Sequence, residues 1–194
     1  MARTREFDPQ EALVRAMNVF WIKGYRHTSL MNLVQDTGVG KKGLYTVFGN
    51  KHDLYIKAME YYKCMQAEEL LPDIEKRDAG VAEILDLFNR ALNFTRSDLG
   101  TRGCMVCNAM AEFGDRVPEI SHATSSHIER FRQALRNALL NSVNRNELDH
   151  SVNVNVYANF LSSVLQSLML MSRAGTDFNF MKDTVDVTLH LLRH

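Results

Sequence analysis

Apolar side chains recur every three or four residues along most of this chain, which is the spacing of amphipathic α-helices. We find no alternating strand pattern of useful length and no internal repeat. The pattern therefore predicts an all-α fold of about nine helices. The clearest stripes are Leu13, Ala16, Met17 and Phe20; Leu54, Ala58, Tyr61 and Met65; Val81, Ile84, Leu85, Phe88, Ala91 and Leu92; and Ile120, Thr124, Ile128, Phe131, Leu135, Ala138 and Ser142.

Polar residues, proline and glycine mark the ends of the first helix. Asp8 is a predicted N-cap, Pro9 fits the first helical position, and Glu11 is placed to complete a capping box. Gly24 follows the apolar stripe, where a residue in the left-handed conformation would end the helix.

Two short helices and a long one are predicted next. Thr28 caps the first short helix, and Thr37-Gly38-Val39 turns the chain into the second, which holds residues 41–45. Asn50 caps the long helix, and Pro72 is expected to mark its limit. Further helices are predicted at about 81–92, 104–113, from Pro118 onward, 152–173 and 178–192.

The composition is that of a globular protein, with 45% apolar and 24% charged residues. No run of 18 apolar residues is present and the N-terminus lacks a secretory signal, so neither a membrane span nor export is expected. Three cysteines, an odd number, in a chain without an export signal indicate a reducing compartment. We therefore expect a soluble, cytoplasmic protein.

The net charge of zero hides an uneven distribution. Residues 1–55 hold eight Lys and Arg against five acids, a balance of 8 − 5 = +3, whereas the other residues hold 15 bases and 18 acids, or −3. A basic end is a weak indication of a nucleic-acid-binding module. A solvated face explains the same difference equally well.

The two short helices, joined by a glycine-containing turn and flanked by a helix on each side, form a helix-turn-helix pattern. The second one is too short and too polar to be core, since only Leu44 is expected to face inward. Its first turn offers Lys41, Lys42 and Gly43, which are cationic or small enough to approach a DNA groove closely.

This region resembles the DNA-binding signature of the TetR family in order and spacing. The resemblance implies a helix-turn-helix domain over residues 1–55 and a helical effector-binding and dimerisation domain over 56–194. Gly40 stands where the family often has a serine or threonine cap, and Lys42-Gly43 replaces a commoner small, hydroxyl-bearing pair. These departures lower helix propensity and leave the operator sequence open. The matching residues are Phe20, Gly24, Tyr25, Thr28, Ser29, Leu30, Leu33, Val34, Thr37, Gly38, Val39, Leu44, Tyr45, Phe48, Lys51 and Leu54.

The resemblance implies DNA-binding roles for individual residues. Thr28 would cap its helix and face a phosphate, while Lys41, Lys42 and Gly43 would form the base-reading turn, where lysine donates to guanine O6 or N7. Exposed lysines that only solvate a face are the alternative explanation.

Five further positions complete the DNA surface that the resemblance implies. Tyr45 and Thr46 would reach backbone phosphate, and Lys51 would hold another phosphate. Arg3 and the nearby Arg5 are candidates for an arm into the minor groove. Tyr45 has core packing as its alternative.

The last two helices are the predicted dimer surface, because specific affinity for a palindrome requires two paired recognition helices. In TetR-like proteins these two helices of each subunit form an intermolecular bundle. An intramolecular core is the alternative. The predicted interface residues are Leu161, Val164, Leu165, Leu168, Met181, Val185 and Leu189.

The middle helices are the predicted sensor, since family members bind apolar or aromatic ligands there. Methionine suits an adaptable pocket. The same aromatic and methionine residues at helical spacing are equally typical of core. The predicted lining residues are Phe88, Leu92, Met105, Met110, Phe113, Phe131, Tyr157, Phe160 and Met169.

Cys104 and Cys107 form a second candidate sensor. Three residues apart at a helix N-terminus, they would lie on one face, where the backbone potential and Arg102 lower a thiol pKa. Oxidation to a disulfide or reaction with an electrophile is one reading, and a small buried apolar residue is the other.

The sequence supports two other classes of protein less well than a regulator. No phosphate-binding glycine loop, metal-ligand helix motif or nucleophile elbow is present, so no enzyme and no cofactor is predicted. Cys64 lies far from the other cysteines, and His122 and His127 are five apart, so no metal site is predicted. An adaptor that has lost DNA binding is disfavoured by the intact motif. The sequence thus predicts a homodimeric, DNA-binding regulator, expected to act as a repressor and to be released by a small apolar or electrophilic effector or by cysteine modification.

Overall fold

The computed structural model describes residues 7–192, and this part of the chain consists of helices with no strands, which confirms the predicted all-α fold. Arg3 and Arg5 lie outside the described residues. The elements are α1 (Pro9–Lys23), α2 (Leu30–Thr37), α3 (Lys41–Phe48), α4 (Lys51–Ile74), α5 (Val81–Phe94), the short 3-10 helix η1 (Gly100–Arg102), α6 (Met105–Phe113), α7 (Pro118–Asn144), α8 (Val154–Arg173) and α9 (Phe178–His190).

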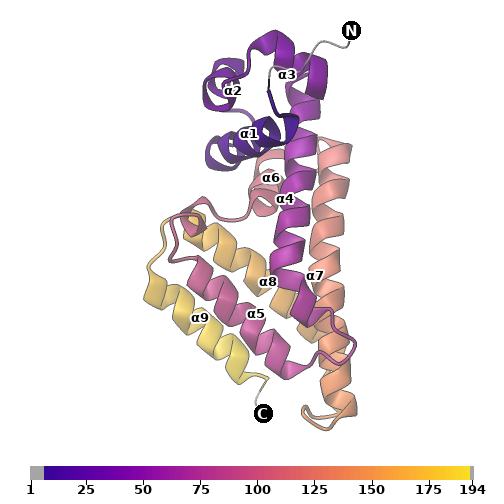
Figure 1. Cartoon of the computed structure of the whole chain (residues 1–194). Helices are drawn as coiled ribbons and strands as arrows, with labels where there is room; N and C mark the ends of the chain where they lie inside the picture. The colour runs from indigo at the N-terminus through magenta and orange to yellow at the C-terminus, as the bar shows by residue number, and fades with distance from the viewer. Residues whose placement is uncertain (1–6, 193–194) are drawn as a thin grey trace.

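Helices α1, α2 and α3 gather around the N-terminal end of α4 and form a small unit at one end of the molecule (Figure 1). Leu33, Leu44 and Leu54 are fully buried in its core. The ring of Phe20 packs edge-on against that of Tyr55, with centroids 5.0 Å apart. Burial of these apolar side chains from four helices fixes the short helices α2 and α3, which would not be stable alone.

The caps of α1 differ in part from those predicted. Asp8 is the N-cap, and its carboxylate accepts from the Gln10 amide at 2.8 Å. Glu11 does not complete a capping box, because its carboxylate pairs with Arg15 one turn further on. Gly24 ends the helix with a positive φ of 76° but with ψ of 170°, which is outside the left-handed helical region.

Thr28 is not the N-cap of α2, and that prediction was wrong. Thr28 is 1% exposed and its hydroxyl donates to the Gly24 carbonyl at 2.6 Å. The next residue, Ser29, is the cap and completes a capping box with Asn32. Two adjacent hydroxyl residues both suit a cap, and the burial of Thr28 against the end of α1 decides between them.

The long helix α4 links the two ends of the molecule (Figure 1). Asn50 caps it as predicted and forms a capping box with Asp53. The helix continues past Pro72 to Ile74, so the predicted limit at Pro72 was wrong. A proline in the last turn costs few intrahelical bonds, and Leu71 and Ile74 are buried on either side of it. The predicted domain boundary after residue 55 falls inside this helix.

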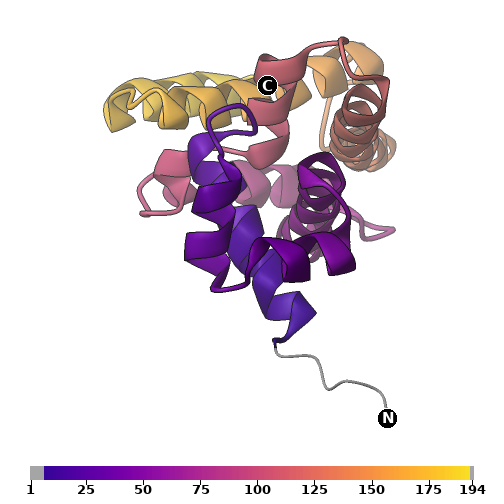
Figure 2. The same ribbon diagram turned by 90° about the horizontal axis from the view of Figure 1, so that it is seen from above.

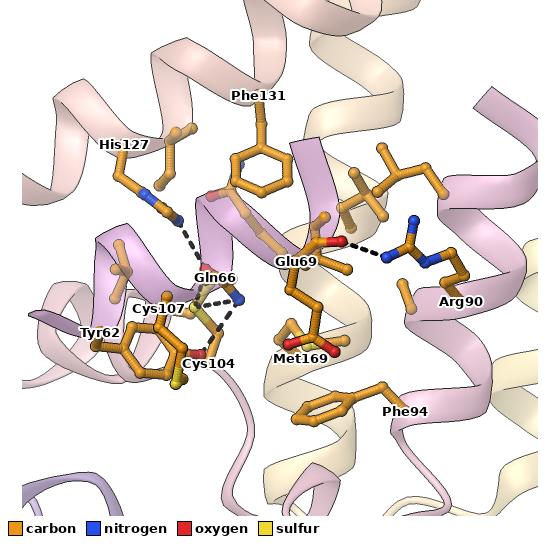
Figure 3. Close-up of a pocket in the computed structure, with 18 of the residues that line it drawn as sticks. Tyr62, Gln66, Glu69, Arg90, Phe94, Cys104, Cys107, His127, Phe131 and Met169 are labelled. Carbon is orange, nitrogen blue, oxygen red and sulfur yellow. Dashed lines mark hydrogen bonds between the residues drawn. The ribbon is translucent and has the colours of Figure 1, made fainter. Parts of the chain in front are cut away.

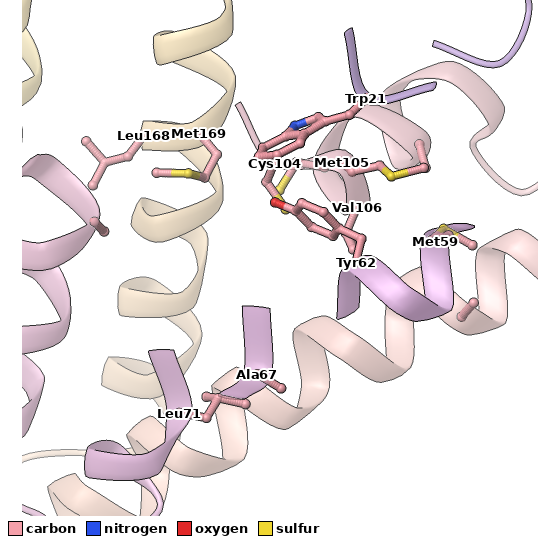
Figure 4. Close-up of a cluster of buried hydrophobic side chains, with 14 of the residues drawn as sticks. Trp21, Met59, Tyr62, Ala67, Leu71, Cys104, Met105, Val106, Leu168 and Met169 are labelled. Carbon is pink, nitrogen blue, oxygen red and sulfur yellow. The ribbon is translucent and has the colours of Figure 1, made fainter. Parts of the chain in front are cut away.

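The rest of the chain packs in layers on α4. Helix α7 runs alongside α4, and α5, α8 and α9 form a second layer, with α6 wedged between this layer and the N-terminal unit (Figures 1 and 2). Side chains from α1, α4, α6 and α8 meet in one buried cluster (Figure 4). The residues labelled there are Trp21, Met59, Tyr62, Ala67, Leu71, Cys104, Met105, Val106, Leu168 and Met169.

The predicted dimer-interface residues belong to the core of the single chain. Six of them are at most 9% exposed, and Leu165 is half-buried. The strongest apolar stripe of each helix faces the rest of its own chain, so these residues stabilise the fold of the single chain, and their part in a dimer stays a prediction. The six are Leu161, Val164, Leu168, Met181, Val185 and Leu189.

A second apolar face on α8 and α9 remains uncovered. Of eleven exposed large apolar side chains in the described residues, six belong to α8, α9 and the residue after α9. By length and composition alone α8 could cross a membrane, although a third of its apolar window is buried in this fold. The six exposed residues are Val156, Phe160, Leu170, Phe180, Val187 and Leu191.

Candidate nucleic-acid interface and effector pocket

The outer surface of α3 is basic and polar. Lys41, Lys42 and Thr46 are exposed, while Leu44 and Phe48 anchor the helix in the core. The N-cap Gly40 makes no side-chain hydrogen bond, so the first backbone N–H groups of α3 lack a side-chain acceptor. Free N–H groups and two lysines at one helix end form a surface that suits an anion.

Tyr45 and Lys51 lie at the edge of this surface. The Lys41 ammonium lies 5.8 Å from the centre of the half-buried Tyr45 ring. The Lys51 ammonium lies 4.2 Å from the centre of the Tyr25 ring. Partial burial lowers the pKa of Lys51, and the nearby Glu112 carboxylate opposes this shift.

Gly43 faces its own domain rather than the outer surface. A Cβ atom at this position would lie 2.9 Å from Val39 Cγ1 and 3.3 Å from a ring atom of Phe7. The prediction that Gly43 forms part of a DNA-reading turn stays a prediction. Glycine is needed here because Phe7 and Val39 cover the helix backbone.

A cavity of about 300 Å³ lies between α4, α5, α6, α7 and α8. Of the nine residues predicted to line it, only Phe131 and Met169 do so. The stripe residues Phe88, Leu92, Met105 and Phe113 are buried in the core. Of the remaining three, Met110 and Phe160 are exposed and Tyr157 is half-buried, and all lie outside the cavity.

A chain of polar side chains crosses one wall of the cavity (Figure 3). His127 Nε2 lies 2.8 Å from Gln66 Oε1, and the Gln66 amide group donates to the Tyr62 hydroxyl at 3.2 Å. Burial lowers the pKa of His127 to about 4, and the charges of Lys63 and Arg130 act in the same direction. The neutral imidazole therefore donates from Nε2 to the amide oxygen. The sequence did not indicate a role for these residues, because single polar residues within an apolar stripe resemble the exposed polar residues of any helix.

Both cysteines of the CxxC segment line the same cavity. The thiol of Cys107 and the backbone N–H groups at the start of α6 bond to the Cys104 sulfur, and the Tyr62 hydroxyl adds a further bond. Together they lower the pKa of Cys104 to about 6 against the opposing effect of burial. The bond to Cys104 and burial raise the pKa of Cys107. Arg102 is not part of this effect, because its guanidinium stacks 5.4 Å from the Trp21 ring centre.

The end of α1 is held by the segment that precedes α6. The Trp21 indole N–H donates to the Gly103 carbonyl at 3.0 Å. Arg173 of α8 donates to the Trp21 and Ile22 carbonyls at 3.0 and 3.3 Å. Since Trp21 of α1 also lines the cavity, the helix-turn-helix unit forms part of the cavity wall.

Glu112 makes a second connection between α6 and the helix-turn-helix unit. Its carboxylate accepts from the backbone N–H groups of Tyr25 and Arg26 at 2.9 and 2.6 Å. These two groups lie in the turn between α1 and α2. Local sequence pattern does not connect Glu112 with this turn, because the two are 86 residues apart in the chain.

We expect Glu112→Ala to loosen this turn. Two N–H groups would lose a charged acceptor, which lowers the free energy of unfolding by about 1–2 kcal/mol at a partly exposed site. Urea titration measures the loss, and hydrogen exchange should speed up at the amides of Tyr25 and Arg26. Asp115→Ala removes the same charge from an exposed position and is the control. Equal stability of the two variants would contradict a capping role.

Comparison with known proteins identifies this architecture. Residues 12–58 match the profile described as "Bacterial regulatory proteins, tetR family", and residues 80–186 match "Tetracyclin repressor-like, C-terminal domain". A helix-turn-helix unit joined to a helical domain with a cavity defines the class as transcriptional regulators that bind DNA. Because the second profile covers more than half of the chain, this chain belongs to the TetR family. The family and the relatives that it matches are transcriptional regulators, not enzymes.

Individual relatives are distant but match nearly the whole chain. The uncharacterized HTH-type transcriptional regulator YezE of Bacillus subtilis (strain 168) is 27% identical over 193 residues, which cover 99% of this chain and 100% of YezE. The HTH-type transcriptional repressor ComR of Escherichia coli (strain K12) is 27% identical, with 97% of this chain and 90% of ComR covered.

Solved structures have the same fold. A cysteine mutant of the TetR family regulator CifR, complexed with 26-bp double-strand operator DNA, superposes with a TM-score of 0.85 at 22% identity, over 97% of this chain and 98% of that one. Reduced NemR of E. coli has a TM-score of 0.79 at 16% identity, over 92% and 93%.

Proposed function

We propose that this regulator is a cytoplasmic homodimeric repressor that binds a palindromic operator and is released when a small ligand or a thiol reaction changes its cavity. The basic outer surface of α3 supports operator binding, since Lys41 and Lys42 stand exposed beside unoccupied N–H groups. ComR, a relative over nearly the full chain, is a repressor. Lys51, Tyr45 and Thr46 are proposed to hold phosphates at the edge of the same surface. Thr28 is left out because its hydroxyl is turned inward.

The dimer is proposed to form through the uncovered face of α8 and α9. Phe160 and Phe180 are 42% and 59% exposed, and together with four aliphatic side chains they form an apolar face on two neighbouring helices. Such faces on soluble proteins generally mark interfaces. A second copy would cover this face and would place two recognition helices on one duplex.

The single observation that most supports regulation through the cavity is its position between α4 and α6. Gln66 of α4 bonds to His127 of α7 and lies 3.8 Å from the Cys104 sulfur at the start of α6. A ligand that separates these groups would move α4, which holds the helix-turn-helix unit, and α6, which bonds to it through Glu112. One turn of DNA is about 34 Å, so a shift of a few ångströms would misalign one recognition helix.

Reaction at the cysteines would act on the same residues. The lowered pKa of Cys104 gives its sulfur thiolate character near neutral pH, and the thiolate is the reactive form. Oxidation with Cys107, or addition of an electrophile, would break the bonds to Gln66 and Tyr62. Cys64 is exposed and outside the cavity.

Selection from randomised duplex DNA, in reductant and again in mild oxidant, tests this proposal. We expect a palindrome to be enriched in reductant and lost in oxidant. The variant with Cys104→Ser and Cys107→Ser should retain the palindrome in oxidant, whereas Cys64→Ser should behave like the wild type. If the wild type still selects the palindrome in oxidant, a thiol reaction is ruled out as the release signal and a small ligand remains. If no sequence is enriched at low salt, the proposal fails and an adaptor role gains support.

A further inference from the structure

The charged side chains that line the cavity differ in whether other groups of the protein already pair with them. Glu69 and Arg90 are the acidic and basic side chains among the lining residues, and His127 is neutral. The charge that a ligand meets therefore depends on which of these two side chains is already paired.

Arg90 is occupied by the protein itself. Its guanidinium lies 3.5 Å from the Asp73 carboxylate and 3.7 Å from that of Asp86, and it donates to the backbone carbonyl of Glu69. Two carboxylates and a carbonyl compensate the one positive charge. An anionic ligand would have to compete with these groups, so Arg90 is a poor anion site.

The carboxylate of Glu69 is in the opposite situation. Within residues 7–192 it has no hydrogen bond or ion pair, because only its backbone oxygen bonds to Arg90. Figure 3 shows its side chain directed away from Arg90, toward Phe94 and Met169.

The remaining walls suit the apolar part of a cation. Trp21, Tyr62, Phe94 and Phe131 supply four aromatic rings, and the cavity is of a size that small ligands fill. Aromatic faces attract organic cations and the apolar surface holds a hydrocarbon skeleton. No equivalent set of unpaired donors exists among the described lining residues for a carboxylate.

We propose that the effector of this cavity is an amphipathic organic cation, an amine or ammonium on an aromatic or aliphatic skeleton, with its charged group at Glu69. This inference rests on the proposed ligand-responsive function and specifies the class of ligand. It is separable from DNA binding, which the α3 surface would retain if the inference were wrong.

Three probes with one skeleton test the charge. We would titrate 6-phenylhexylamine, 6-phenylhexan-1-ol and 6-phenylhexanoate by calorimetry, and follow the emission of Trp21, the one tryptophan of the chain, as a report from the cavity wall. Because Glu69 is exposed at the cavity, we expect the amine to bind about two- to fivefold more tightly than the alcohol, and the carboxylate to bind most weakly. Only the amine should release the selected operator at low concentration.

Variants of Glu69 distinguish recognition of the ligand's charge from recognition of its shape. Glu69→Gln should lower amine affinity to that of the alcohol and leave alcohol binding unchanged, while Glu69→Lys should make the carboxylate the tightest probe. Glu68→Gln removes the same charge from the neighbouring position, which is exposed as Glu69 is but does not line the cavity, and should match the wild type. Equal affinity of amine and carboxylate, or equal effects of the two glutamine variants, would overturn the inference. If no probe binds, the cationic class is likewise rejected, and operator binding measured in the same preparation shows whether the DNA-binding function stands.

Discussion

Replacing Phe160 by glutamate is expected to convert the proposed dimer to a monomer and to abolish tight operator binding. Phe160 lies in the uncovered face of α8 and α9 and is 42% exposed, so the chain itself should fold normally. A charge in the middle of an apolar interface has to be desolvated on each subunit, and the twofold axis doubles this cost. Sedimentation velocity at micromolar concentration should give the monomer mass of 22.2 kDa.

The loss of dimerisation should appear directly in DNA affinity. Two linked recognition helices gain about 10²–10⁴ in affinity over one, so we expect operator binding to fall by at least about 100-fold. Leu140→Glu is the matched control, because Leu140 is 41% exposed but lies on α7. A Phe160→Glu protein that sediments as a dimer, with an unchanged circular dichroism spectrum, would show that another surface forms the interface.

Removal of both Lys41 and Lys42 is the second change with a large expected effect. These lysines are exposed in the first turn of α3, and a dimer would present four of them. We expect operator affinity to fall by about 100-fold or more at low salt. The slope of log affinity against log salt should decrease by about 0.9 for each phosphate that the variant no longer neutralises. Titrations at three salt concentrations measure both quantities.

The same titrations distinguish base reading from phosphate binding. If a lysine donates to guanine, its single alanine variant should relax the preference at one base pair by about 1–3 kcal/mol with little change in salt slope. Lys76→Ala with Arg77→Ala removes two exposed positive charges at the far end of α4 and controls for net charge. Equal loss in the control pair would mean that total charge, rather than the α3 surface, carries the affinity.

Local pattern in the sequence determined the helices and the DNA-binding motif. The apolar periodicity, the caps Asp8 and Asn50 and the helix-ending Gly24 act within one or two turns, so they can be read without knowing the fold. The motif from Phe20 to Leu54 is equally local, because its helices contact one another across short loops. The CxxC pair at the start of α6 was visible for the same reason.

Tertiary structure decided which face of each helix is covered and by what. Periodicity finds an apolar stripe but not its partner, so Leu161 and Met181 were assigned to an interface although their own chain buries them, and Phe160 was assigned to a cavity although it lies on the surface. Glu69 and Glu112 look alike in sequence, yet one faces a cavity unpaired and the other caps a distant turn. Such roles depend on contacts between residues far apart in the chain, and only the packing of the helices brings those residues together.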